Sequence, residues 1–338
     1  MTTVRLARLI ALAAALLLAP RAGAQVSRGT LLAFVTNEAS NDVSVVDLDA
    51  RRVVATIPLG GRARGVQAAP GGRTIYVAVS DASPTVETSV DAIVAIDVAT
   101  RKITARIEAG SDPEQLALSV DGRRIFAANE DAGTATAIEI ATRRTISSAV
   151  VGIEPEGVAA SPDGRWVFVT AETSNSVSMI DARTAKVLGN VLVDIRPRAV
   201  AFSPDSRRAY VTAEIGGSVT LIDVRKRTVA TTLPLESGGG KPVGVVVSPD
   251  GSRVWVANGA TGRVSVVDPD AARVLATIPV GRRPWGIALS RDGGTLVTAN
   301  GMSNDISIID TKAMREVGRV TVGSRPWGVA IVRAGDTR

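Results

Sequence analysis

The sequence contains neither cysteine nor histidine. Without cysteine the chain forms no disulfide bond, and without either residue it lacks the usual ligands of structural zinc, copper, haem and iron–sulfur clusters. The nucleophile–histidine pairs of serine and cysteine hydrolases are excluded as well. A bound metal would therefore be a hard cation held by oxygen atoms, such as calcium.

Long hydrophobic runs are also missing, because the N-terminal apolar run, Leu9 to Ala19, has only 11 residues. As a helix it would rise about 16 Å, roughly half of a bilayer core. Ala22-Gly23-Ala24 follows it and is typical of a signal-peptidase cleavage site. We expect residues 1–24 to be a signal peptide and residues 25–338 to form one domain. The protein would then be periplasmic or secreted, with no membrane span after cleavage.

Excess charge of one sign is small once that segment is removed. The formal net charge of the whole chain is +6, and three arginines without any acid lie in residues 1–24. The remaining arginines and lysines recur at fixed repeat positions instead of clustering on one face, which argues against nucleic-acid binding.

The chain does contain a repeat, a β-branched phrase that ends in an acidic residue. Spacings of 50, 42, 42, 42, 45 and 42 residues separate its seven copies, which end at Asp47, Asp97, Glu139, Asp181, Asp223, Asp268 and Asp310. A period of about 42 is typical of a four-stranded propeller blade.

One repeat, residues 155–193, shows how each unit is divided. It predicts strands at 155–161, 166–171, 177–181 and 187–193, and the first two are separated by the turn sequence Pro162-Asp163-Gly164. At the chain ends, residues 325–332 form a first strand, whereas residues 31–59 form a second, third and fourth. The sequence thus predicts an all-β, seven-bladed β-propeller with four antiparallel strands per blade. Its ring is closed by pairing the C-terminal strand with the N-terminal three.

Aromatic residues are few, and six of the ten occupy one equivalent place in the second strand. We interpret them as packing residues between blades. They are Phe34, Tyr76, Phe126, Phe168, Tyr210 and Trp255, with Val297 in the seventh unit.

The phrases FVTN (34–37), SPDGRWVFVTA (161–171), NSVSMID (175–181) and RVLATIPVGRRPWGIALS (273–290) resemble YVTN-family β-propeller repeats. The resemblance covers all seven units. With the export signal, it extends to the periplasmic propellers associated with PQQ-dependent alcohol catabolism. It implies a partner such as a quinoprotein dehydrogenase or a transporter component. It implies no PQQ site, because the repeats carry no PQQ chemistry.

A functional site is expected where the fourth-to-first and second-to-third loops surround the channel mouth. Most fourth-to-first loops contain a proline, which should hold itself and the preceding residue extended. The residues before it, or before Ala63 in its place, are Arg62, Asp112, Glu154, Arg196, Lys241, Arg283 and Arg325. The residues after it are Arg64, Glu114, Glu156, Arg198, Val243, Trp285 and Trp327. The second-to-third loops add Glu38, Glu130, Glu172 and Glu214.

Three interpretations of this mouth remain open. The basic and aromatic residues would bind a protein partner or a flat anionic ligand, or would only plug the channel. This set is Trp285, Trp327, Arg283, Arg325, Arg62, Arg64, Arg196 and Arg198. No cofactor is expected, although calcium would suit an acidic group of Asp112, Glu114, Glu154 and Glu156; ion pairs between blades explain the same residues.

The main functional prediction is a non-catalytic binding or scaffolding protein, accessory to a quinoprotein alcohol-oxidation pathway. The alternative is a propeller lactone hydrolase that uses carboxylates and a hard metal ion. A cell-surface adhesion module is a third interpretation. The repeats do not identify the ligand or the oligomeric state.

Overall fold

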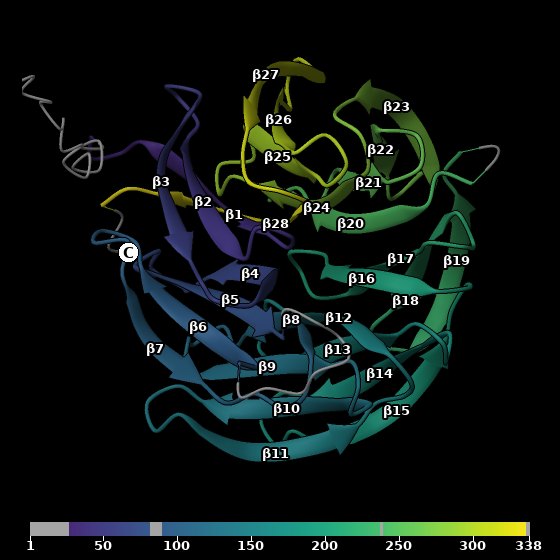
Figure 1. Cartoon of the computed structure of the whole chain (residues 1–338). Helices are drawn as coiled ribbons and strands as arrows, with labels where there is room; N and C mark the ends of the chain where they lie inside the picture. Colours follow the sequence, from purple (N-terminus) through teal and green to yellow (C-terminus); the bar gives the residue numbers. More distant parts are fainter. Residues whose placement is uncertain (1–26, 82–89, 237–238, 336–338) are drawn as a thin grey trace, which may run out of the picture.

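The computed structural model describes residues 27–81, 90–236 and 239–335 as a ring of seven four-stranded sheets (Figure 1). The predicted signal peptide, residues 1–24, lies outside the described residues. No helix in the described part of the chain is long and apolar enough to span a membrane.

Each blade is an antiparallel sheet whose strands follow the chain order from the channel outward. The first strands line the channel: β28 (Pro326–Arg333), β4 (Arg62–Ala68), β8 (Pro113–Leu118), β12 (Pro155–Ala160), β16 (Pro197–Phe202), β20 (Pro242–Val247) and β24 (Pro284–Leu289). The second strands are β1 (Leu31–Asn37), β5 (Thr74–Ser80), β9 (Arg124–Asn129), β13 (Trp166–Ala171), β17 (Arg208–Ala213), β21 (Val254–Asn258) and β25 (Thr295–Asn300).

The third strands end in the repeated acid: β2 (Asp42–Asp47), β6 (Ala92–Asp97), β10 (Thr134–Glu139), β14 (Ser176–Asp181), β18 (Ser218–Asp223), β22 (Arg263–Asp268) and β26 (Asp305–Asp310). The outer strands are β3 (Arg52–Pro58), β7 (Ile103–Ile107), β11 (Arg144–Val150), β15 (Val187–Leu192), β19 (Thr228–Pro234), β23 (Arg273–Pro279) and β27 (Arg315–Thr321). We number the blades from the closing sheet, so blade 1 is β28-β1-β2-β3, blade 2 is β4 to β7, and blade 7 is β24 to β27.

Ring closure follows the prediction, since β28 pairs with β1 in antiparallel register from Leu31↔Arg333 to Asn37↔Pro326. The pairing removes the free edge that either terminal strand would otherwise present. The predicted seven-bladed fold is confirmed.

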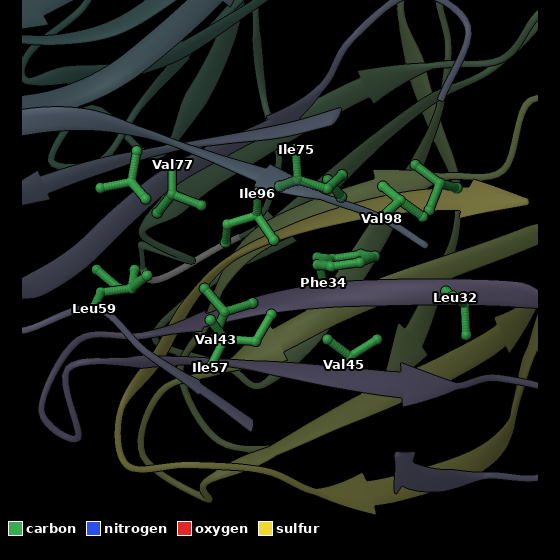
Figure 2. Packing of buried hydrophobic residues seen from close by; sticks show 14 of the residues in the cluster. Leu32, Phe34, Val43, Val45, Ile57, Leu59, Ile75, Val77, Ile96 and Val98 are labelled. Carbon is green, nitrogen blue, oxygen red and sulfur yellow. The ribbon is translucent and has the colours of Figure 1, made fainter. Parts of the chain in front are cut away.

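The repeated aromatic residues pack between blades. Phe34 is fully buried in one cluster with Ile75 and Ile96 of blade 2 and Val45 of its own blade (Figure 2). Phe168 likewise packs against Phe202 of the next blade, with ring centroids 4.7 Å apart. The hydrophobic core is therefore divided among the interfaces of adjacent blades, which fixes each blade's loops relative to those of its neighbours.

Candidate functional site

The two predicted loop sets meet at one end of the channel through a repeated hydrogen bond. In six blades the carbonyl of the residue before the inner-strand proline accepts the N–H of a second-to-third loop residue. The distance is 2.9 Å from Glu172 to Glu154, 2.8 Å from Glu214 to Arg196, and 3.0 Å from Glu38 to Arg325. The backbone thus places a second-to-third loop residue beside a fourth-to-first loop residue in these blades, and the second-to-third loop residue is a glutamate in four of them and Gly259 or Gly301 in the other two.

The residue before each of these prolines is not extended, so that expectation is wrong. The six φ angles lie between 47° and 61°, at Asp112, Glu154, Arg196, Lys241, Arg283 and Arg325. This left-handed conformation costs about 1–2 kcal/mol for a residue with a Cβ. The repeated hydrogen bond to its carbonyl helps to offset that cost.

A bulge then directs the residue that follows the proline position in every inner strand. The pairing register shifts just after the proline position in all seven blades, for example between Pro155 and Val158 and between Pro197 and Val200. A bulge re-aims the local side chain. Neighbouring blades consequently bring charged side chains together across the mouth.

Blades 2 to 5 form what we call the acid–base sector, built on Arg64, Glu114, Glu156 and Arg198. Arg64 Nη2 lies 2.8 Å from Glu114 Oε1, and its Nε lies 3.6 Å from Glu38. Arg62 Nη2 lies 2.9 Å from Asp112 Oδ1. Both arginines are largely buried, so each neutralises carboxylates that water solvates poorly.

The second arginine of the sector is more heavily surrounded. Arg198 Nη2 lies 2.7 Å from Glu156, and its Nη1 contacts Glu172 and approaches Glu214 at 3.7 Å. Glu172 Oε2 also forms an ion pair with Arg196, 2.7 Å from its Nε. Three carboxylates therefore share one buried guanidinium, and Glu172 is held between two arginines.

Protonation differs among these carboxylates. Burial raises the pKa of Glu172 to about 7, against the opposing charge of Arg198. Burial and the neighbouring Glu156 raise the pKa of Glu114 well above its usual range. For Glu214, burial raises the pKa, but Arg198 and Arg283 more than compensate and hold it below its usual value. Burial thus makes Glu172 easier to protonate than an ordinary glutamate.

The structure assembles only part of the predicted metal group. Carboxylate oxygens of Asp112, Glu114 and Glu130 all lie within 4.8 Å of one another. Glu154 and Glu156 are not in that group: Glu154 accepts a hydrogen bond from Thr173 at 2.5 Å, and Glu156 pairs with Arg198. Because Arg62 and Arg64 already contact Asp112 and Glu114, a cation would have to bind beside two guanidinium groups.

Blades 6, 7 and 1 form what we call the aromatic sector, with Val243, Trp285 and Trp327 at the same inner-strand position. Arg283 and Arg325 flank the Trp285 ring at 5.5 and 5.7 Å from its centroid. Trp327 is only 6% exposed and lies 5.8 Å from the guanidinium of Arg64. Below the mouth, both tryptophans line a channel cavity of about 140 Å³. Of the two, Trp285 is the more accessible to a ligand.

Sequence reasoning placed Glu172 only among the acidic loop residues and did not single it out. The usable signal was its position in the repeat, since Glu172 precedes the loop that carries Arg196 and Arg198 in the next blade. The predicted roles of the other site residues remain predictions.

Comparison with protein families gives two partial matches. The family described as "Lactonase, 7-bladed beta-propeller" matches residues 194–322, and the family "Cytochrome D1 heme domain" matches residues 85–214. No curated protein matches the chain. The families support a propeller; neither concerns the YVTN repeats or PQQ-dependent alcohol catabolism.

Solved structures with the same architecture are numerous but distant in sequence. The periplasmic gluconolactonase of Pseudomonas aeruginosa is 20% identical with a TM-score of 0.72, over 90% of this chain and 99% of that one. A putative 6-phosphogluconolactonase of Bacteroides uniformis is 18% identical with a TM-score of 0.72, over 90% and 100%. Hydrazine synthase of Kuenenia stuttgartiensis is 19% identical with a TM-score of 0.70, over 82% and 96%. At these identities the likeness shows the fold alone.

Proposed function

We propose that this protein is a lactone hydrolase whose active site is the acid–base sector of the channel mouth. The observation that carries the proposal is Glu172, a carboxylate held between Arg196 and Arg198 whose pKa burial raises to about 7. A general base is most effective when its pKa lies near the working pH. The lactonase family match over residues 194–322 and the two similar lactonase structures support this choice over a scaffold.

Glu172 supplies the proton transfers. Its carboxylate takes a proton from water as the water oxygen bonds to the lactone carbonyl carbon, giving a tetrahedral oxyanion. When that intermediate collapses, the ring C–O bond breaks and the protonated Glu172 returns its proton to the leaving alkoxide. The product is an open-chain hydroxy acid, and the carboxylate is regenerated.

Arg196 is placed to stabilise the oxyanion. Its side chain is 45% exposed at the mouth, and within the described residues its ion pairs use Nε. The two Nη groups therefore remain for the carbonyl oxygen of a substrate, where a preorganised donor is worth about 10²–10³ in rate. Arg198, which is buried, holds Glu172 from the other side.

The proposed reaction does not need a metal, although a hard cation remains the alternative. Calcium would have to use Asp112, Glu114 and Glu130, and two of these already pair with arginine. We expect activity to survive treatment with EDTA. Loss of activity with EDTA and recovery with calcium would instead assign this group as a metal site.

The decisive experiment measures acid release from glucono-δ-lactone and γ-butyrolactone at pH 7.5, corrected for spontaneous hydrolysis. Glu172→Gln should lower kcat/KM by about 100-fold or more. The matched control is Glu139→Gln, because Glu139 ends β10 at the opposite end of the blade and its carboxylate accepts a hydrogen bond from the nearby hydroxyl of Thr142. Absence of turnover by the unmodified protein, or equal rates for both variants, would contradict the proposal.

A binding function is the second candidate, favoured by Trp285 and its two flanking arginines. In that case the partner would be a periplasmic protein, such as a quinoprotein dehydrogenase or a transporter component. We place either activity in the periplasm, on the expected signal peptide. Recovery of a mature chain that begins at Gln25 from the periplasmic fraction would test that location.

A further inference from the structure

Three threonines occupy one equivalent position in the second strands, two residues after the packing aromatic. They are Thr36 in β1, Thr170 in β13 and Thr212 in β17. The other four blades have alanine there, at Ala78, Ala128, Ala257 and Ala299. All three threonines are fully buried, so their hydroxyl groups need partners inside the protein.

Each hydroxyl joins two blades. Thr170 Oγ1 accepts the N–H of Gly157 at 2.8 Å and donates to the carbonyl of Arg198 at 3.0 Å. Thr36 Oγ1 accepts the N–H of Gly328 at 2.8 Å and donates to the carbonyl of Arg64 at 2.6 Å. In both cases one inner strand is bonded to the inner strand of the next blade.

The bulge explains why a hydroxyl is needed at this point. The register of β12 against β13 shifts between Pro155 and Val158, so Gly157 lies where ladder pairing is interrupted. The threonine bonds that N–H in place of a strand partner. The blades also approach very closely here, since a Cβ on Gly157 would lie 2.2 Å from the carbonyl oxygen of Arg198.

Two of the three threonines lie in a blade that precedes a buried arginine of the mouth. Two of the three bond the backbone of Arg64 and Arg198, the arginines of the acid–base sector. The acidic members Glu114 and Glu156 follow blades with alanine at this position. The third threonine, Thr212, accepts the N–H of Ala199 at 3.1 Å and donates to the carbonyl of Val243, an uncharged residue, at 2.6 Å.

We infer that Thr170 is a positioning residue that holds Arg198 against Glu172, and that Thr36 holds Arg64 against Glu114 in the same way. A long arginine side chain reaches several carboxylates only if its Cα is fixed, because each ångström of backbone movement changes every ion-pair distance. Loss of the hydroxyl frees the carbonyl of Arg198 and leaves the N–H of Gly157 without its partner. The inference rests on the proposed function only for its kinetic test.

The chain provides its own matched control. Thr170→Val and Thr36→Val each remove one hydroxyl from the same kind of interblade bond, but Thr170 bonds the carbonyl of Arg198, whereas Thr36 bonds that of Arg64, which pairs with Glu38 and Glu114 instead of Glu172. Thr212 is unsuitable as a control, because its hydroxyl accepts the N–H of Ala199, the residue after Arg198. Thr170→Ser keeps the hydroxyl and should behave as the unmodified protein. The first measurement is the titration of Glu172 by ¹³C NMR of labelled glutamate, which requires no activity.

We expect Thr170→Val to move the Glu172 midpoint to higher pH by about one half to one pH unit, because Arg198 opposes protonation of that carboxylate. Arg196, Glu156 and Glu130, the other charged groups that act on Glu172, are unchanged. The kcat/KM for lactones should fall about tenfold or more, since small displacements of catalytic groups have effects of up to about 100-fold.

Thr36→Val should lower the thermal midpoint to a similar extent as Thr170→Val while leaving the Glu172 titration in place. If both valine variants shift the titration equally, or neither does, the threonines are only structural and the inference is wrong. A shift in Thr170→Val with no lactone turnover by any form would uphold the positioning role while removing the proposed function.

Discussion

The two sectors of the mouth have the same backbone and opposite chemistry. In the acid–base sector the repeated inner-strand position holds Arg64, Glu114, Glu156 and Arg198, whose charges are buried and paired. In the aromatic sector the same position holds valine and two tryptophans. The side chain of Arg325, which lies beside them, is 58% exposed. The propeller thus supplies seven equivalent placements, and a few side chains decide which part of the ring can perform acid–base chemistry.

The two sectors should differ most in how much their arginines contribute to the free energy of unfolding. Arg198→Met leaves Glu156, Glu172 and Glu214 without their shared cation, whereas Arg325→Met removes an exposed partner of Glu38 at 3.5 Å. We expect the first change to lower the free energy of unfolding by about 3–5 kcal/mol at pH 7.5. The second should cost no more than about 1 kcal/mol.

Urea unfolding of both variants provides the measurement. At pH 5 the Arg198→Met penalty should shrink, because the orphaned glutamates then take up protons in the folded state. Equal losses in the two variants would show that the sectors do not differ in the way the ion pairs suggest.

The pH dependence of stability is the next largest effect. The pKa of Glu172 is about 7 in the folded protein, above its ordinary value of 4.5, so folding favours the protonated form. Its contribution is fully present below pH 4.5 and is lost as the pH rises through 7. We expect unfolding free energy to fall by about 1–3 kcal/mol between pH 5 and pH 7.5 from this group.

Glu172→Gln should remove that part of the slope, and Glu139→Gln should keep it. Over the same range, activity should rise with pH as the Glu172 carboxylate forms, so stability and activity change in opposite directions. A Glu172→Gln variant with an unchanged stability slope would mean that another carboxylate titrates near neutral pH.

The fold could be predicted from the sequence because each repeat carries its own strand and turn signals. The predicted strand 166–171 is β13 itself, and Pro162-Asp163-Gly164 forms the expected turn. Sequence reasoning also placed the charged residues at the mouth. It could not give their pairing, since Arg64 and Glu114 are 50 residues apart and the choice of partner depends on side-chain geometry.

Local rules failed where interactions between loops decided the conformation. The residues before proline adopt positive φ because their carbonyls accept loop N–H groups, which a dipeptide preference does not include. Glu154 belongs to the acidic stretch in sequence, but it turns to Thr173 and away from the carboxylate group. The roles of Thr36, Thr170 and Thr212 were not predicted, because a β-branched residue is common in any strand and its sequence position does not reveal a bond to the next blade.

The smallest expected effect tests whether the aromatic sector takes part in binding the substrate. Trp285→Ala removes the ring between Arg283 and Arg325 but keeps Arg283 itself, which pairs with Glu214 at 2.7 Å, so kcat should be unchanged and KM should rise about fivefold, equivalent to about 1 kcal/mol. Trp166→Ala is the control, because Trp166 also has an arginine over its ring, Arg227 at 5.7 Å, but lies at the other end of its blade. If Trp285→Ala leaves KM unchanged yet abolishes capture of a periplasmic protein that Trp166→Ala retains, the aromatic sector is a partner surface, and the two halves of the mouth serve separate functions.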